Sequence, residues 1–236
     1  MIFCTSIAPK HINLNAQKIA TDSWLDLGIP VYSFNSPEEI ELLKSQYPKV
    51  EFVPTLRTME LTYGKQYVSV NAILDWCKEK RVENVCIINS DIEMRIDLKT
   101  LAKIENEMSN QILMSQRVNY GSNKQGVFRS GIDTFFINEK FLSIYPQSVY
   151  AIGQCHWDYW IPYKAILSGI NTSFIRNEIT FHKEHKEQYD HNSWLKTGRY
   201  FQWENNLFQF STTKGIGEMS TYVHTYIMNA SKTITI

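Results

Sequence analysis

Two acidic side chains follow one of the most apolar stretches of the chain. Residues 85–88 read Val-Cys-Ile-Ile, and Asp91 and Glu93 come shortly after them. A short continuous apolar run is typical of a strand buried on both faces of a parallel sheet. Because side chains two residues apart on an extended segment point the same way, both carboxylates could bind one hard divalent cation. The alternative is a solvated acidic turn.

The elements that must position this pair are predicted from the alternation of short apolar runs with helical periodicity in the first ninety residues. This alternation is typical of a parallel sheet with crossover helices. We expect strands at 2–7, 30–34, 50–53 and 85–89, and helices at 14–27, from 37 and from 70. In such sheets ligands bind at the carboxyl ends of the strands, so Asp91 and Glu93 lie where a ligand site is expected.

The regular alternation ends after residue 108. A helix is predicted at 98–108, strands at 111–117, 131–138 and 171–175, and a helix from 157 that Gly169 closes. The fold class predicted is α/β, a single domain with a mixed, mostly parallel central sheet flanked by helices.

Composition excludes several classes of function. The 24 basic and 24 acidic residues balance, so nothing favours binding to nucleic acid or to an anionic membrane. No run reaches the roughly 20 apolar residues that a membrane span requires, and we expect a cytoplasmic protein. The scattered cysteines form no CxxC pair and favour a reducing compartment. They are Cys4, Cys77, Cys86 and Cys155.

Two motifs resemble those of a known family. Residues 90–93, Ser-Asp-Ile-Glu, resemble the DxD-type motif of the GT-A glycosyltransferases, with glutamate in the last place. Residues 128–136 and 152–160 resemble the G-x-D-x-F strand and the W-D-x-W helix start of small bacterial and viral nucleotide-sugar transferases. The resemblance covers most of residues 1–185. It implies one GT-A domain over 1–236, with a nucleotide-binding half (1–95), an acceptor and catalytic half (96–190) and an extension (191–236) that packs back.

The resemblance also implies a donor site that binds a nucleoside diphosphate sugar with Mn²⁺ or Mg²⁺. Asp91 would reach the ribose or the metal, Glu93 would ligate the metal, and His182 would add a contact from the late region. A zinc site of His182, His185 and His191, or a merely solvated polar loop, is the alternative. The other residues expected to bind the donor are Thr5, Ser6, Ile7, Arg57, Lys65, Gly131 and Asp133. Arg57 and Lys65 could equally be ordinary surface charges.

Asp158 is the candidate general base, since inverting sugar transfer needs a carboxylate that accepts the proton of the acceptor hydroxyl. The alternative is that Asp158 only caps a helix. Trp157 and Trp160 flank it, and their rings could form a platform for the acceptor sugar.

We therefore expect a metal-dependent glycosyltransferase that moves a sugar, from a UDP-sugar by preference, to a hydroxyl of a glycan or other acceptor. Contact with a membrane is expected only through a lipid-linked acceptor. A noncatalytic carbohydrate-binding protein on the same fold is the first alternative. A sugar-nucleotide nucleotidyltransferase is the second, although the glycine-rich loop of that class is missing from residues 5–10.

Overall fold

The computed structural model describes residues 1–11, 13–121, 127–185 and 190–236. The strands are β1 (Ile2–Thr5), β2 (Val31–Asn35), β3 (Glu51–Pro54), β4 (Asn84–Ile88), β5 (Ile92–Met94), β6 (Gln111–Tyr120), β7 (Val127–Asn138), β8 (Asn171–Ile175), β9 (Thr180–Lys183) and β10 (Lys232–Ile234). The helices are α1 (Leu14–Leu25), α2 (Pro37–Leu43), α3 (Glu60–Tyr63), α4 (Val70–Glu79), α5 (Leu98–Met108), α6 (Glu139–Ile144), α7 (Trp157–Leu167), α8 (His191–Glu204) and α9 (Thr213–Ala230), with a 3-10 turn η1 (Phe208–Phe210).

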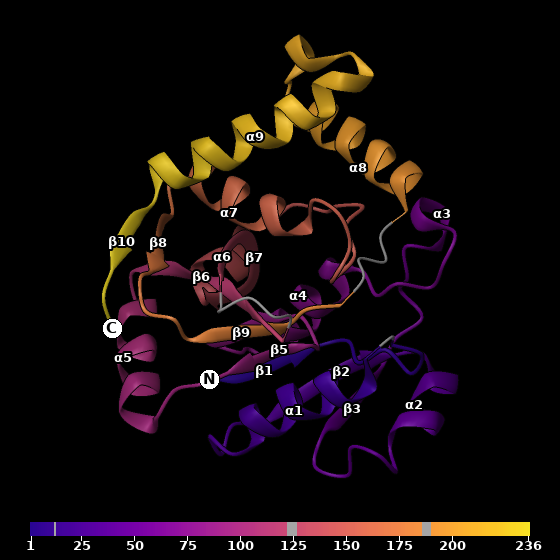
Figure 1. Cartoon of the computed structure of the whole chain (residues 1–236), viewed down its shortest axis with the longest axis vertical. Coiled ribbons are helices and arrows are strands. Elements are labelled where there is room, and N and C mark those ends of the chain that lie inside the picture. Colours follow the sequence, from indigo (N-terminus) through magenta and orange to yellow (C-terminus); the bar gives the residue numbers. More distant parts are fainter. Residues whose placement is uncertain (12, 122–126, 186–189) are drawn as a thin grey trace.

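The strands form one sheet in the order β10-β8-β6-β7-β4-β1-β2-β3. Strand β7 runs antiparallel to both of its neighbours, and the other pairs in this order are parallel. Outside this order, β9 pairs parallel with β6 and antiparallel with the short β5. The predicted fold class, a mixed and mostly parallel sheet flanked by helices, is therefore confirmed (Figure 1).

Helices cover both faces of the sheet. Helices α1, α2 and α5 contribute to one apolar core, and α4, α6, α7, α8 and α9 contribute to the other. Strand β4 feeds both cores: Val85 and Ile87 pack on one side, while Cys86 and Ile88 pack on the other. This two-sided burial explains the continuous apolar run, because every side chain of a central strand faces a helix layer.

Local sequence signals set several element boundaries. Helix α2 begins with a capping box, in which the Ser36 hydroxyl accepts from the Glu39 backbone N–H and the Glu39 carboxylate accepts from the Ser36 N–H. Helix α7 begins after His156, whose backbone is left-handed at φ 68°. In the described part of the chain no helix combines the length and apolarity that a membrane span needs.

The segment after β4 is extended and forms a strand of its own. Residues 92–94 form strand β5, which is paired with β9 and held from the other side by α1. The indole N–H of Trp24 donates to the Ile92 carbonyl at 3.0 Å, and the Met94 N–H donates to the Ser23 hydroxyl at 3.0 Å. Asp91 is thus fixed between two anchored strands.

Candidate functional site

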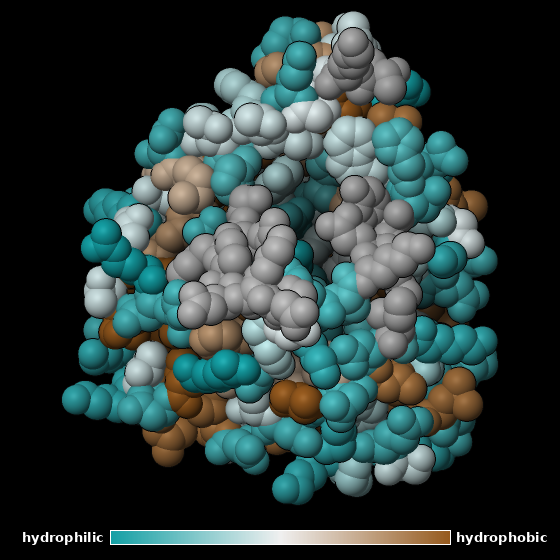
Figure 2. Space-filling view, viewed as in Figure 1, coloured by the Kyte–Doolittle hydropathy of each residue, from teal (hydrophilic) through white to brown (hydrophobic). Residues whose placement is uncertain are grey.

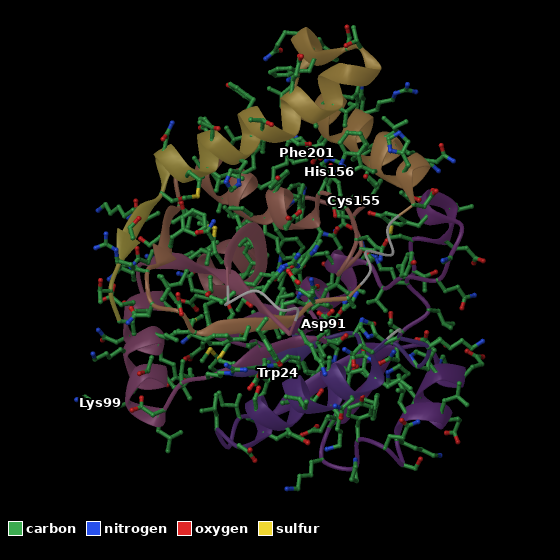
Figure 3. All side chains as sticks on the ribbon, viewed as in Figure 1. Trp24, Asp91, Lys99, Cys155, His156 and Phe201 are labelled. Atoms are coloured by element: carbon green, nitrogen blue, oxygen red, sulfur yellow. The ribbon has the colours of Figure 1, made fainter. Side chains whose placement is uncertain are left out.

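The carboxylate of Asp91 is surrounded by three imidazole rings. Its Oδ2 lies 3.0 Å from Nε2 of His185, 3.3 Å from Nε2 of His182 and 3.5 Å from Nε2 of His11. His11 lies in the loop after β1, His182 on β9 and His185 just beyond β9. Figure 3 shows Asp91 near the middle of the molecule, with Cys155 above it before the start of α7. Chain segments far apart in sequence therefore converge on one oxygen atom.

The nitrogen and oxygen atoms of this cluster suit a divalent cation as ligands. His11, Asp91 and His185 each offer a ligand atom, and these atoms all lie within 4.8 Å of one another. Nε2 of His182 also lies 3.2 Å from Nε2 of His185, so only one of these two nitrogens can donate to the other. With a cation bound between them, both nitrogens could instead turn their lone pairs toward the ion. Imidazole and carboxylate together are common ligands of first-row transition metals.

The electrostatics of Asp91 favour the ionised form. Burial alone would raise its pKa, but hydrogen bonds from His11, His182 and His185 outweigh burial and hold the pKa well below its usual range. The side chains of Asp91 and His11 are each 13% exposed, so the cluster is reachable from solvent without being open to it. An ionised, half-enclosed carboxylate is ready to bind a cation without first losing a proton.

Gln17 of α1 joins the two segments that carry His11 and Asp91. Its Oε1 accepts from the Ala8 N–H at 2.9 Å and from the Ser90 hydroxyl at 2.7 Å, and its Nε2 donates to the Ala8 carbonyl at 2.9 Å. Gln17 is fully buried. One rigid side chain therefore fixes the loop after β1 against the residue that precedes Asp91.

Glu93 lies outside the histidine cluster. Its carboxylate receives two hydrogen bonds from Arg95, at 2.9 and 2.8 Å, and one from the Tyr120 hydroxyl at 3.0 Å. The hydrogen bond from Arg95 is the main cause that lowers the pKa of Glu93. The structure therefore brings Asp91 together with His182, as the sequence suggested, and leaves Glu93 in a separate ion pair.

A second polar cluster is centred on Asp133 of β7. Arg117 donates from Nη1 to Asp133 Oδ2 at 2.6 Å, and Asn89 donates from Nδ2 to Asp133 Oδ1 at 2.7 Å. Both oxygens of this buried carboxylate are thus engaged within the protein. Gly131 lies beside the pair, and a Cβ placed there would meet Asp133 at 3.3 Å and Arg117 at 3.4 Å. The predicted donor residues Gly131 and Asp133 are therefore brought together around Arg117.

Asp158 lies in the first turn of α7 and is partly buried. Burial is the main cause that raises its pKa to about 7, Asp133 raises it further, and Arg117 acts in the opposite direction. The N-cap of α7 is His156, so Asp158 is not the capping residue of this helix. A carboxyl group that titrates near neutral pH suits a general base.

The two tryptophans require a correction. Trp157 and Trp160 are 2% and 0% exposed, and they pack in the core against Phe135 and Tyr150 respectively. The Trp160 indole donates to Glu204 at 3.4 Å. Enclosed rings offer no free face to a sugar, so the expected acceptor platform is wrong for this conformation. Their spacing in sequence reflects the buried face of α7.

The remaining predicted donor residues lie in two places. Thr5 and Ile7 are fully buried at the end of β1, where Ile7 donates its N–H to the Ser33 hydroxyl, and Ser6 between them is partly exposed. Arg57 instead pairs with Asp75 and Gln147 on the rim of a separate hollow, and Lys65 is exposed. The structure does not bring these two cations to Asp91.

Several buried polar atoms at this edge of the sheet have no hydrogen-bond partner among the described residues. Such atoms are few in native proteins and usually mark places where water, an ion or a ligand binds. Figure 2 shows a hollow on this face of the molecule, beneath α8 and α9. The buried atoms of this kind that lie on or directly after β1, β4, β6, β7 and β9 are Thr5 Oγ1, Asn89 Oδ1, Arg117 Nε, Asn119 Oδ1, Thr134 Oγ1 and His182 Nδ1.

Comparison with solved structures places this geometry in a known fold. Residues 1–349 of S. aureus TarS, solved in complex with UDP, superpose with a TM-score of 0.54 at 14% identity, over 86% of this chain and 65% of that one. Longer S. aureus TarS gives a TM-score of 0.55 at 13% identity, over 86% of this chain and 39% of that one. The fold is GT-A-like. This chain spans about two thirds of the shorter TarS chain and well under half of the longer one.

A further similar structure, from Desulfovibrio desulfuricans G20, is described as a nucleotide-diphospho-sugar transferase. It matches 99% of this chain and 97% of its own length at 10% identity, with a TM-score of 0.48. No protein-family profile matches the sequence, and no curated protein matches it. At 13 and 14% identity the likeness to TarS establishes the GT-A-like fold alone, and the residues of the site must carry any argument about activity.

Proposed function

We propose that this protein is a metal-dependent glycosyltransferase that transfers a sugar from a nucleoside diphosphate sugar to a hydroxyl of a glycan or other acceptor. One observation carries the proposal: three imidazole Nε2 atoms converge on the Asp91 carboxylate at the carboxyl end of a GT-A-like sheet. That edge is where open α/β sheets bind nucleotides. The UDP bound by the structurally similar TarS favours a UDP-sugar as donor.

Asp91, His11, His182 and His185 would hold the cation, for which Mn²⁺ suits three imidazoles better than Mg²⁺ does. When bound, a divalent cation supplies positive charge that neutralises the leaving diphosphate. The end of β1 borders the same edge, and Ser6, which is partly exposed between the buried Thr5 and Ile7, would contact the base or ribose.

Asp158 would serve as the general base. Its pKa of about 7 leaves much of it ionised at neutral pH, and its partial exposure lets an acceptor hydroxyl approach. The carboxylate would accept the hydroxyl proton as the oxygen attacks the anomeric carbon. Attack from the side opposite the diphosphate inverts the anomeric configuration.

The test is calorimetric titration of UDP, GDP, dTDP and CMP with and without Mn²⁺. The variants are Asp91→Asn and Glu93→Gln, which remove one carboxylate each with little change of shape. We expect one nucleotide to bind only with Mn²⁺, and Asp91→Asn to abolish this binding. If Glu93→Gln retains Mn²⁺-dependent nucleotide binding, the metal belongs to the histidine cluster. If Glu93→Gln loses this binding, Glu93 is a metal ligand.

Product analysis completes the test. Incubation of the matching nucleotide sugar with hydroxyl acceptors, followed by NMR, reports whether sugar is transferred and with which anomeric configuration. Retention would exclude Asp158 as base in a single displacement. Nucleotide binding that is indifferent to metal and to Asp91→Asn would contradict the transferase proposal and favour a noncatalytic carbohydrate-binding protein.

A further inference from the structure

A groove lies at the β3 edge of the sheet, between β3 and α4. It consists of two adjoining hollows of about 340 and 550 Å³ that share the side chain of Trp76. Strand β3 is the last in the strand order, three places from β4, whose carboxyl end leads to Asp91. Neighbouring strands lie about 4.8 Å apart, so β3 is roughly 14 Å from β4 across the sheet. The groove is therefore separate from the histidine cluster but within reach of an extended molecule bound there.

The floor of the groove is apolar and is centred on two aromatic rings. The ring centroids of Tyr32 and Trp76 lie 4.8 Å apart, and both side chains are partly exposed. Trp76 also contacts the buried Phe34, whose ring is 5.4 Å away and nearly perpendicular to it. This partial exposure distinguishes Trp76 from Trp157 and Trp160, which the core encloses. The other apolar side chains in the larger hollow are Ile2, Phe52, Val53 and Val82.

Charged side chains of both signs surround this floor in equal number. Balanced charge creates no field that would attract a polyanion such as nucleic acid. Donors and acceptors side by side instead suit a neutral ligand with many hydroxyl groups. Two of the charged groups are held in place, because Arg57 donates to Asp75, which also accepts from the Tyr145 hydroxyl. The charged residues are Glu51 and Lys80 in the larger hollow and Arg57, Asp75, Lys78 and Glu79 in the smaller one.

An added peptide strand is the competing occupant of a sheet edge. Strand β3 is poorly suited to it, because the strand has only 4 residues and ends in Pro54, which has no N–H to donate. A sugar ring needs no backbone partner. It has faces of C–H groups that pack on aromatic rings and a rim of hydroxyls that require hydrogen-bond partners. The groove offers both.

We propose that this groove is a second carbohydrate site, in which a neutral glycan chain packs on Trp76 and Tyr32 and bonds through its hydroxyls to the surrounding charged side chains. Its role as the holder of the distant part of a glycan acceptor rests on the proposed function, whereas the binding itself does not. A long acceptor held at both places would have a lower KM than a short one, because its far end reaches the groove.

The test is fluorine NMR of the protein labelled with fluorotryptophan, without nucleotide or metal. The chain has 6 tryptophans, and the Trp76 resonance is the one lost in Trp76→Phe. The ligands are cellohexaose, maltohexaose and chitohexaose, with a Thr-Val repeat peptide for comparison. We expect at least one saccharide to shift the Trp76 resonance with a Kd of about 1 mM or lower, and to leave Trp203 unmoved. Trp203 is the matched control because it is 65% exposed on α8 and does not line the groove.

Substitutions test the same contact by titration calorimetry. Trp76→Leu should weaken saccharide binding by about tenfold or more, while Trp203→Leu should leave it unchanged. If Trp76→Leu does not fold, Lys80→Ala and Glu51→Gln, which alter exposed side chains, should each lower the affinity in its place. The proposal is overturned if no saccharide moves the Trp76 resonance, if Trp203 moves equally, or if only the peptide moves Trp76.

Asp91→Asn separates this site from the proposed function, because the variant should bind the saccharide as the wild type does. A protein that binds saccharide at Trp76 but transfers no sugar would contradict the proposed function and leave the carbohydrate site intact. Sugar transfer whose KM is the same for a single sugar and for a hexasaccharide, in the wild type and in Trp76→Leu, would overturn the role of the groove in holding the acceptor.

Discussion

Replacement of Gln17 by leucine tests how α1 organises the histidine cluster. The variant keeps a side chain of similar volume but removes hydrogen bonds to the Ala8 N–H, the Ala8 carbonyl and the Ser90 hydroxyl. Each such bond contributes about 1 kcal/mol to stability. Ala8 is only partly buried, so water replaces some of what its two groups lose, whereas Ser90 is 9% exposed. We expect a loss of about 2 kcal/mol of unfolding free energy, which lowers the midpoint of thermal unfolding by about 4 to 8 °C in a domain of this size.

The same variant should weaken metal binding. The loop after β1 carries His11, and without Gln17 that loop must be ordered by the metal itself. Loss of a residue that supports a ligand typically costs about 10- to 100-fold in metal affinity, so we expect at least a tenfold rise in the Kd for Mn²⁺.

Urea unfolding and Mn²⁺ titration calorimetry measure the two effects of Gln17→Leu. The control is Gln46→Leu, which removes a single exposed bond to the Leu42 carbonyl and should change stability by less than about 0.5 kcal/mol. A Gln17→Leu protein that is less stable but binds Mn²⁺ as tightly as the wild type would refute the positioning argument. Unchanged stability would refute the hydrogen-bond argument itself.

Three further predictions follow from the two clusters and the C-terminal helices. Asp158→Asn should lower the rate of sugar transfer by about 10²- to 10⁴-fold while Mn²⁺ and nucleotide binding persist. In the wild type, kcat/KM should fall about tenfold per pH unit below about pH 7, because the protonated Asp158 carboxyl cannot accept a proton. Gly131→Ala should displace Arg117 and lower kcat/KM with little change in thermal midpoint. Gly198→Ala should destabilise the protein by about 1 to 3 kcal/mol in thermal or urea unfolding, because its Cβ would lie 2.4 Å from the side chain of Ile216. The control is Gly217→Ala, whose Cβ would meet open space and which should stabilise α9 slightly.

The fold and the position of Asp91 could be predicted because they depend on local signals. The apolar run 85–88 identifies a strand buried on both faces, and the carboxyl end of such a strand is a ligand edge whatever the rest of the chain does. The capping box at Ser36 fixed the start of α2 in the same way. His182 was expected near the metal from the family resemblance, and the structure places it beside Asp91.

The partners of these residues could not be predicted, because they depend on contacts between distant segments. His11 follows the first strand with no motif of its own, and its place beyond the carboxyl end of β1 is the only sequence signal that could have suggested it as a ligand. Arg117 read as an ordinary strand residue, because its bond to Asp133 exists only when β7 pairs with β6. The ion pair between Arg95 and Glu93 could not be predicted either, although the two residues are only two positions apart. The division of the chain at residues 95 and 190 stays a prediction.

The most direct test of the account is electron paramagnetic resonance of Mn²⁺ titrated into the wild type and into His11→Ala, with and without UDP. The account predicts a bound Mn²⁺ spectrum that changes when UDP is added, and a clearly weaker site in His11→Ala, because His11 ligates the ion that holds the diphosphate. If Mn²⁺ binding is unaffected by His11→Ala and the spectrum of bound Mn²⁺ does not change with UDP, the central claim that the cluster around Asp91 is the metal and nucleotide site is contradicted.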